Sequence, residues 1–358
     1  MQIWKKLKNN PQLWQKYFIR EKIIHAIREF FLKEKFHEVE TPLLIPAVIP
    51  ESYLEVFETF LMDRKRSKKR MFLTTSPEVS LKKLLVAGIG NCFEITKNFR
   101  NTETDSNHHH PEFTILEWYR VGATYKDLMN DCERLFLFIY KKLKRTKLDK
   151  YEIECQNHKI DLSPPWERIS VKDALLKYAK IDFDDITQTN AIAQNCDKAF
   201  PIDKIEKVAL RKGYYVGKNN TWEEIFNQIF LNEIEPHLNR LSKPVFLYDY
   251  PAPLAALAKL KKEDKRLAER VELYINNLEI GDGCNELTDY KEQKKRFEQE
   301  MIKIRKMGKT EVKIDTDFLD VLKKGLPDCA GMAMGLDRLV MLFTNSKSIA
   351  DVLLFPIT

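Results

Sequence analysis

The sequence predicts an α+β fold in which helices flank an antiparallel sheet. Segments in which apolar and polar residues alternate, at 92–95 and 113–119, are typical of paired strands. Longer segments with apolar residues at helical spacing lie around them, at 17–35 and 126–145. With 358 residues, of which 44% are hydrophobic, the chain can bury a sizeable core.

The N-terminal part of the chain predicts a long helix, an extended segment and a hairpin. Apolar residues between 17 and 35 fall largely on one helical face. The segment after this helix, residues 36–41, is predicted to be extended, because Pro42 disfavours a helical conformation in the residue before it. Residues 53–62 and 71–75 predict the two strands of the hairpin. The tip between them, residues 64–70, carries six positive charges. This basic run is either a solvated turn or a contact for an acidic partner.

The middle of the chain predicts a helix start, a short hairpin and a region with several helices. Ser76-Pro77-Glu78 opens a helix, because proline suits the first helical position and glutamate suits the positive end. Residues 151–162 predict a short hairpin. Residues 165–245 are less regular, with helical stretches near 170–180 and 222–235. We expect a peripheral helical region there, within a single domain that spans the chain.

The C-terminal part returns to strands. They are predicted at 246–250, 271–275 and 278–287, and two helices follow at 290–308 and 317–325. These elements complete the predicted α+β domain.

A strand of small residues stands out near the C-terminus. Small residues recur at every second position in Gly331-Met332-Ala333-Met334-Gly335, and Arg338 follows. This period puts one bare face on a strand. Either a helix packs closely on that face or a flat ligand lies on it, in which case Arg338 could reach a phosphate. A second arginine of this kind, Arg100, stands far upstream between Phe99 and Asn101.

The composition limits the classes of protein to which the chain can belong. Charged residues make up 32% and the formal net charge is +7, which permits an anionic partner without requiring one. No Cys-x-x-Cys pair occurs among the six cysteines, so neither a zinc site nor a disulfide framework is expected. The start of the chain is polar and basic, and no apolar run approaches the roughly 18 residues of a membrane span. The sequence predicts a cytoplasmic protein with no membrane partner.

Three blocks in one order resemble the signature motifs of class II aminoacyl-tRNA synthetases. They are a long helix with a strand ending at Pro42, a Phe-Arg pair with a loop and strand at 99–119, and the small-residue strand with arginine and helix at 331–343. Pro111-Glu112-Phe113-Thr114 and the runs at 279–289 and 351–356 resemble the lysine branch in particular. The resemblance implies the class II catalytic fold. It also implies a homodimer built on residues 17–42.

The lysine branch contains two kinds of enzyme that the N-terminus distinguishes. Its tRNA-charging members carry an N-terminal β-barrel that reads the anticodon, and the fewer than about twenty residues before the first motif are too few for a five-stranded barrel. We therefore expect no anticodon-binding domain. The chain is then similar to elongation factor P β-lysine ligases, which activate (R)-β-lysine with ATP and attach it to a lysine side chain of elongation factor P.

Ala333 agrees with that similarity. The β-lysine ligases resemble this chain in having alanine at this position, where tRNA-charging lysine enzymes usually carry glycine. One added methyl group in a substrate pocket is worth about 1–3 kcal/mol. We therefore expect Ala333 to line the amino-acid pocket.

The reaction that the resemblance implies joins a carboxylate to the α-phosphate of ATP. Two anions meet and charge builds on phosphorus, so fixed cations and metal ions are needed rather than a nucleophilic side chain. Arg100 matches the arginine that clamps the α-phosphate and the substrate carboxylate, and Arg338 matches the arginine at the γ-phosphate. Surface salt bridges are the alternative for each. Glu103 is expected to reach the adenine amino group.

Four more residues match positions that bind ATP and magnesium. Glu272 and Glu279 match two carboxylates that hold Mg²⁺, an ion that prefers carboxylate and phosphate oxygens. Phe113 matches the aromatic side chain that stacks on adenine, and His109 matches a loop histidine near the phosphates. The alternatives are exposed charges for the glutamates, a core position for Phe113 and a polar loop for His109.

The amino-acid pocket is implied by a set of acidic residues. Glu78 matches the residue that takes the substrate amino group, Glu117 and Tyr119 match the pair at the distal ammonium, and Glu286 matches a further pocket carboxylate. Carboxylates that share a pocket repel one another and raise each other's pKa unless a cation lies among them. This independently favours a diamine such as lysine or β-lysine.

The chain departs from the family pattern in two places. The usual Arg-x-Glu of the second motif is here Arg100-Asn101-Thr102-Glu103, with the glutamate one residue later. The lysine branch has asparagine and phenylalanine where this chain has Asp282 and Cys284. Asp282 adds a negative charge that suits a cationic substrate, and Cys284 enlarges the pocket.

Three functions follow from these observations. The first is an ATP-dependent ligase that makes a lysyl-type adenylate and passes it to elongation factor P. The second is a small enzyme that charges a tRNA or a tRNA-like acceptor, with the basic run 64–70 touching phosphates. The third is a regulatory paralogue without activity, against which the retained phosphate and metal residues argue.

Overall fold

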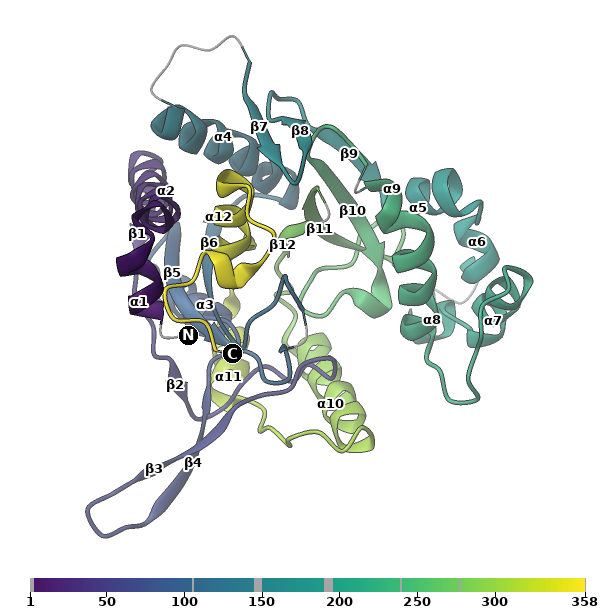
Figure 1. Cartoon of the computed structure of the whole chain (residues 1–358). Helices are drawn as coiled ribbons and strands as arrows, with labels where there is room; N and C mark the ends of the chain where they lie inside the picture. Colours follow the sequence, from purple (N-terminus) through teal and green to yellow (C-terminus); the bar gives the residue numbers. More distant parts are fainter. Residues whose placement is uncertain are drawn as a thin grey trace.

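An eight-stranded sheet forms the centre of the computed structural model, which describes residues 3–104, 106–144, 150–189, 196–238, 240–276 and 278–357 (Figure 1). The strand order is β1-β5-β6-β13-β12-β11-β10-β9. Neighbouring strands are antiparallel, except that β1–β5 and β9–β10 are parallel. The predicted α+β fold with an antiparallel sheet is confirmed, and the two parallel pairs are an addition to it.

The strands follow the predicted segments closely. They are β1 (His37–Glu38), β2 (Leu44–Ile45), β3 (Glu58–Met62), β4 (Lys68–Leu73), β5 (Cys92–Phe99), β6 (Glu112–Val121), β7 (Glu152–Cys155), β8 (His158–Asp161), β9 (Glu167–Ser170), β10 (Val245–Pro251), β11 (Leu267–Ile275), β12 (Leu278–Asn285) and β13 (Cys329–Gly335). Strands β2, β4 and β3 form a separate three-stranded sheet, and β7 and β8 form a two-stranded one.

The helices are α1 (Ile3–Asn9), α2 (Trp14–Lys33), α3 (Glu78–Val86), α4 (Tyr125–Lys144), α5 (Val171–Ala174), α6 (Phe183–Ile186), α7 (Ile202–Arg211), α8 (Trp222–Ile229), α9 (Glu235–Leu238), α10 (Tyr290–Lys306), α11 (Thr316–Gly325) and α12 (Leu336–Thr344). The helices at 17–35, 126–145, 222–235, 290–308 and 317–325 agree with the predicted segments, whereas α1, α6, α7 and α9 were not predicted. Several begin at side chains that accept backbone N–H groups, such as Asp289 before α10 and Thr221 before α8. None of the helices in the described part of the chain is both long enough and apolar enough to cross a membrane.

The central sheet has one apolar face and one polar face because its residues alternate. The residues Phe93, Trp118, Met332 and Val271 lie in one cross-strand row with Gly283, and all four belong to the main core. Helices α2, α4 and α12 supply much of the rest of that core. The residues before and after each of these point to the opposite face, which carries most of the charged groups.

The peripheral helical region expected at 165–245 has a core of its own. Residues from α5 to α9 pack with Val245, Leu247 and Tyr250 of β10, and Figure 1 shows these helices at the β9–β10 edge of the sheet. The sequence did not predict α7, and α5 continues as a π-helical turn over Leu175–Ala179. The division of the chain into domains stays a prediction.

The hairpin that carries the basic run projects from the body of the molecule (Figure 1). Strand β4 begins at Lys68, earlier than predicted, because Lys68 pairs with Met62 and Arg70 with Phe60. The turn is therefore confined to residues 63–67, and part of the basic run lies in a strand. Arg70 forms an ion pair with Glu58 at 2.5 Å, so one of the six charges is balanced within the hairpin.

Candidate active site

A row of acidic residues crosses the polar face of the central sheet. Glu94, Glu117, Ala333, Asp282 and Glu272 are cross-strand neighbours on β5, β6, β13, β12 and β11. Directly opposite residues share a face of the sheet. The strand register therefore places one alanine and four carboxyl groups side by side. Glu94 accepts two hydrogen bonds from Thr41, at 2.8 and 2.9 Å, and so has a structural partner.

The predicted amino-acid residues converge at this row. Glu117 and Glu286 are 2% exposed, and the charges of Glu78 and Glu286 both act on Glu117. Burial first, and then the charge of Glu78, raises the pKa of Glu117 to about 8. Burial raises the pKa of Glu286 to about 7, although the charge of Lys82 lowers it. These three carboxyl groups therefore form one acidic cluster.

Lys82 is the residue in this cluster that the sequence reasoning missed. Its side chain is 1% exposed and forms ion pairs with Glu78 and with Glu286. Both carboxylates raise the pKa of Lys82, so that it stays charged despite burial. The chain itself thus supplies a cation among the carboxyl groups of the amino-acid pocket. The spacing of four residues between Glu78 and Lys82 is a signal for their pairing, but it is common on exposed helices as well.

Tyr119 and Ser76 fix the orientation of Glu117. The hydroxyl of Tyr119 donates to Oε1 of Glu117 at 2.8 Å, and the hydroxyl of Ser76 donates to Oε2 at 2.8 Å. Gly331 leaves room for this arrangement, because a Cβ atom there would lie 2.4 Å from the Tyr119 ring and 2.7 Å from Oε1 of Glu286. The bare face of the small-residue strand is therefore filled in part by Tyr119. Sequence reasoning had not singled out Ser76 as a pocket residue.

Asp282 lies in the acidic row, but its charge is balanced by a neighbour. Arg270 donates from Nε and Nη2 to the two carboxylate oxygens of Asp282, both at 2.9 Å. The charge of Asp282 is thus less available to a cationic substrate than the sequence analysis expected. Cys284 lies next to Gly331 in the sheet register, with its Sγ 3.6 Å from Oε1 of Glu286. Ala333 lies between Glu117 and Asp282.

Arg100 marks the other end of the site. Its guanidinium carbon lies 5.2 Å from the centre of the Phe113 ring, and its buried Nε has no hydrogen-bond partner in the described part of the chain. A buried donor without a partner is costly and rare in folded proteins. Arg100 thus offers a buried hydrogen-bond donor to an anion beside the Phe113 ring.

Arg338 is held on the opposite side by loop and strand atoms. It donates to the carbonyl oxygen of His108 at 3.2 Å and to that of Glu279 at 2.7 Å, and its Nη2 lies 2.9 Å from Nε2 of His109. Burial and the charge of Arg338 lower the pKa of His109, and the charge of Arg100 acts in the same direction. His109 thus feels both arginines, which are 238 residues apart in sequence. Glu103 also acts on His109, raising its pKa.

The position of Arg338 depends on its neighbour Asp337. Asp337 is buried. Its Oδ1 accepts a hydrogen bond from Nη1 of Arg20 at 2.5 Å, and its Oδ2 accepts one from the backbone N–H of Thr114 at 2.7 Å. These bonds tie the start of α12 to α2 and β6. The three predicted motif segments therefore meet at one residue.

Glu272 and Glu279 lie on adjacent strands and repel one another. Glu272 accepts the hydroxyls of Tyr250 and Tyr274 at 2.5 Å each and Arg270 at 2.8 Å. A carboxylate accepts about four hydrogen bonds, so roughly one position on Glu272 is left. The described residues contain no cluster of three or more acidic, histidine or cysteine side chains that could hold a metal on its own. This donor set suits Mg²⁺ that is shared with phosphate oxygens and water.

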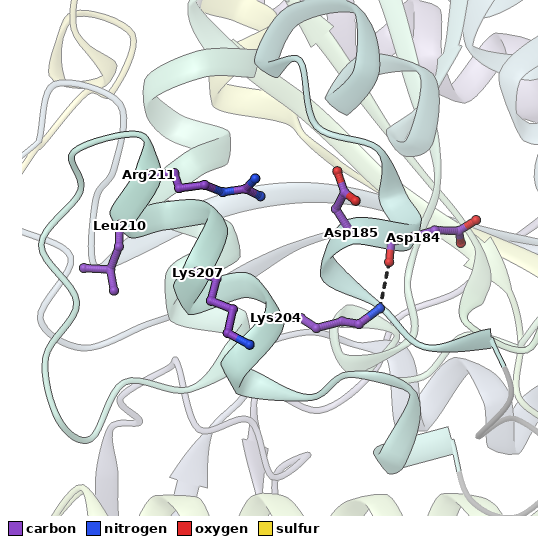
Figure 2. Close-up of a pocket in the computed structure, with 6 residues that line it drawn as sticks. All are labelled: Asp184, Asp185, Lys204, Lys207, Leu210 and Arg211. Atoms are coloured by element: carbon purple, nitrogen blue, oxygen red, sulfur yellow. Dashed lines mark hydrogen bonds between the residues drawn. The ribbon is translucent and has the colours of Figure 1, made fainter.

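Two hollows away from this site carry no such convergence. Both are shallow and lie between α6 and α7. Figure 2 shows the residues that line one of them, namely Asp184, Asp185, Lys204, Lys207, Leu210 and Arg211. Lys204 donates to the carbonyl oxygen of Asp184 at 3.0 Å, and Lys207 pairs with Asp203 at 3.8 Å. Neither hollow contains a predicted site residue.

Comparison with known proteins agrees with this geometry. The chain is 36% identical over 338 residues to an elongation factor P–(R)-beta-lysine ligase from Buchnera aphidicola and 35% identical over 339 residues to one from Pectobacterium carotovorum, covering 94% of both chains in each case. It is 38% identical over 350 residues to a lysine–tRNA ligase from Pelotomaculum thermopropionicum, which is 97% of this chain. The chain spans 64% of the length of that tRNA ligase.

A family model covers the same extent. The model described as tRNA synthetases class II (D, K and N) matches residues 2–358. This range includes the acidic row, the Lys82 cluster and both arginines. The chain therefore belongs to the class II tRNA synthetases of the D, K and N group.

Proposed function

We propose that this protein activates lysine or (R)-β-lysine with ATP and transfers it to a lysine side chain of elongation factor P. The observation that carries the proposal is the charge of the pocket. Glu78, Glu117 and Glu286 contribute three negative charges when ionised and Lys82 one positive charge, which leaves two negative charges for a ligand. A diamine brings two ammonium groups. Burying them here restores neutrality, as a buried site requires.

In this proposal the two arginines bind the anionic groups of the substrates, and the acidic pocket binds the ammonium groups of the amino acid. The amino acid lies with its ammonium groups at Glu78, Glu117 and Glu286 and its carboxylate toward Arg100. Arg100 steadies the carboxylate and the α-phosphate as charge builds, Arg338 holds the far phosphate and Phe113 stacks on adenine. Mg²⁺ at Glu272 and Glu279 would neutralise phosphate oxygens when bound. Attack of the carboxylate on the α-phosphate forms the adenylate and releases pyrophosphate.

Two candidate acceptors have support. The relatives named as elongation factor P ligases match the chain over 94% of both lengths, which favours a protein acceptor. The 38% identity to a lysine–tRNA ligase, together with the basic run on the projecting hairpin, supports a tRNA as the second candidate. A protein acceptor is our first choice, because the match there extends over 94% of the relative, against 64% of the lysine–tRNA ligase.

Mass spectrometry separates these acceptors. The protein is incubated with ATP, Mg²⁺, elongation factor P and either lysine or (R)-β-lysine, and a parallel sample contains tRNA. We expect elongation factor P to gain the mass of one amino-acid residue, and tRNA to remain uncharged. Pyrophosphate exchange with a panel of diamines identifies the amino acid. Efficient tRNA charging with an unmodified factor would overturn the proposal.

Amino-acid binding is expected to tighten as the pH rises through about 7 to 8. Burial raises the pKa of Glu117 to about 8 and that of Glu286 to about 7, so both carboxyls hold protons at lower pH. An incoming ammonium favours their ionised forms, so binding releases protons. Calorimetry in two buffers with different ionisation enthalpies measures that release. Glu117→Gln should remove the part that titrates near pH 8, and an affinity that is constant over this range would contradict the prediction.

The proposal includes a cytoplasmic homodimer. Exposed apolar side chains support a partner surface on the first-motif segment, namely Phe18 and Leu32 on α2 and Leu44 on β2. Such residues on neighbouring elements are typical of a surface that another chain covers. Sedimentation at micromolar concentration should give twice the mass of the chain, and a monomer would count against the dimer.

A further inference from the structure

The segment that contains Glu51 and Tyr53 is fixed beside Arg100. The backbone N–H of Asn101 donates to the carbonyl oxygen of Glu55 at 2.8 Å, which pairs this segment with the residue after Arg100. On the other side, Glu300 of α10 accepts the backbone N–H of Ser52 at 2.8 Å. Both ends of the segment are therefore held, and the loop cannot be treated as a free surface turn.

The side chains of Glu51 and Tyr53 form a hydrogen-bonded pair on this segment. The hydroxyl of Tyr53 donates to Oε1 of Glu51 at 2.7 Å. Tyr53 is 66% exposed, although its neighbours Ser52 and Leu54 are buried. Burial and the charge of Glu51 raise the pKa of Tyr53, and the charges of Arg100 and Arg270 lower it. The charges of both arginines thus reach the Tyr53 side chain, although it is widely exposed.

The charges that act on Glu51 come from both ends of the site. Burial raises its pKa to about 7, and Arg100 is the strongest charge acting on it. Arg100 lowers the pKa of Glu51, whereas the charges of Glu78 and Glu300 raise it. Arg100 belongs to the phosphate end and Glu78 to the amino-acid end. The carbonyl carbon of an adenylate would lie between these two ends.

We propose that Glu51 is the general base of the transfer step, taking a proton from the acceptor lysine. This inference rests on the proposed function. The acceptor amine arrives as an ammonium ion and cannot attack until a proton leaves. Glu51 accepts that proton, the freed nitrogen forms a bond to the adenylate carbonyl carbon, and the bond from that carbon to the phosphate oxygen breaks. AMP leaves with the electron pair, and the second proton on nitrogen goes to the departing phosphate or to water.

The arrangement suits this role for two reasons. Formation of the adenylate needs no base, because the attacking carboxylate is already ionised, so Glu51 has no task in the first step. A base works best when its pKa lies near the working pH, and burial brings Glu51 to that range. Tyr53 is then a positioning residue, since its hydroxyl fixes one carboxylate oxygen and leaves the other for the acceptor.

Glu51→Gln separates the two steps of the reaction. Pyrophosphate exchange, which reports adenylate formation, should stay within about threefold of the wild type. Transfer to elongation factor P in a single turnover at neutral pH should fall by about 100-fold or more, the usual range for loss of a general base. Hydroxylamine, an amine that is already neutral at pH 7, should still be converted to the hydroxamate at close to the wild-type rate. Raising the pH should restore part of the transfer to the factor, because the acceptor lysine then loses its proton unaided.

Glu58→Gln is the matched control, because it removes a carboxyl group from β3, the strand that follows this segment, where Glu58 pairs with Arg70. It should leave pyrophosphate exchange, hydroxamate formation and transfer unchanged. The inference is overturned if Glu51→Gln transfers to elongation factor P at the wild-type rate. It is equally overturned if hydroxamate formation falls as far as transfer does, because the defect would then lie in the adenylate. Failure of the proposed function looks different, since the wild type itself would not exchange pyrophosphate with a diamine or modify the factor.

Discussion

Replacing Arg100 by alanine is expected to lower the rate of adenylate formation by at least about 100- to 1,000-fold. The guanidinium is held over the Phe113 ring, and its buried Nε has no partner in the described residues. An anion that reaches it therefore meets a donor that needs no reorganisation. Loss of one such preorganised donor costs about 2.7–4 kcal/mol in the transition state. Arg100→Lys should recover little, because an ammonium cannot contact two oxygens with a planar fork.

Pyrophosphate exchange at saturating ATP and lysine measures the effect of Arg100→Ala. Arg64→Ala, on the exposed turn of the projecting hairpin, is the control and should exchange at the wild-type rate. The Arg100 variant should melt near the wild-type temperature, because its buried Nε makes no hydrogen bond in the described residues that the substitution would break. A variant that keeps more than about a tenth of the exchange rate would show that Arg100 does not touch the reacting groups.

The fold was largely predictable because the sheet and its helices have clear periods. Strands β5, β6, β10, β11, β12 and β13 and helices α2, α4, α10 and α11 appear where alternation or helical spacing predicted them. The parallel pairing of β9 with β10 was not predictable, because β9 has only four residues and its partner lies more than seventy residues away. Helix α7 was also missed, in the region where apolar spacing was least regular.

The site was predictable where the family motifs name a residue, and less so where partners decide the chemistry. The register brought Glu117, Ala333 and Asp282 into one row, as a shared pocket requires. The sequence could not show that Arg270, twelve residues before Asp282, balances its charge. The same limit applies to Glu51. It lies in a loop without periodicity, and the backbone bridge between Glu55 and Asn101 is what brings its segment beside Arg100.

Lys82 is the clearest case of a residue whose importance comes from burial. A lysine four residues after a glutamate on a helix is normally a weak, exposed ion pair. Here the side chain is 1% exposed and pairs with two carboxylates from different parts of the chain. Removing it would leave Glu78 and Glu286 close together without a cation, in a place that water reaches poorly.

Lys82→Met is therefore expected to lower the free energy of unfolding by about 3–5 kcal/mol at neutral pH, the usual cost of leaving a buried charge unpaired. The pKa of Lys82 is raised in the folded protein, so the lysine stabilises the fold at every pH below its ordinary range near 10.5 and loses this effect only above it. Glu286, whose pKa burial raises to about 7, can escape repulsion by taking up a proton. The loss should therefore be smaller at about pH 5 than at about pH 8.

Urea denaturation at both pH values measures the effect, and the next residue supplies the control. Lys83 also pairs with two carboxylates, Asp315 at 2.9 Å and Asp317 at 2.6 Å, but its side chain is 28% exposed and that of Asp317 is 75% exposed. Lys83→Met should therefore lower the free energy of unfolding by no more than about 1 kcal/mol, because solvent screens ion pairs that are this exposed. If the two variants lose equal stability, the carboxylates around Lys82 are not held as charges in the folded protein. The pocket would then have no net negative charge for a diamine, and the charge count behind the proposed substrate would fail with it.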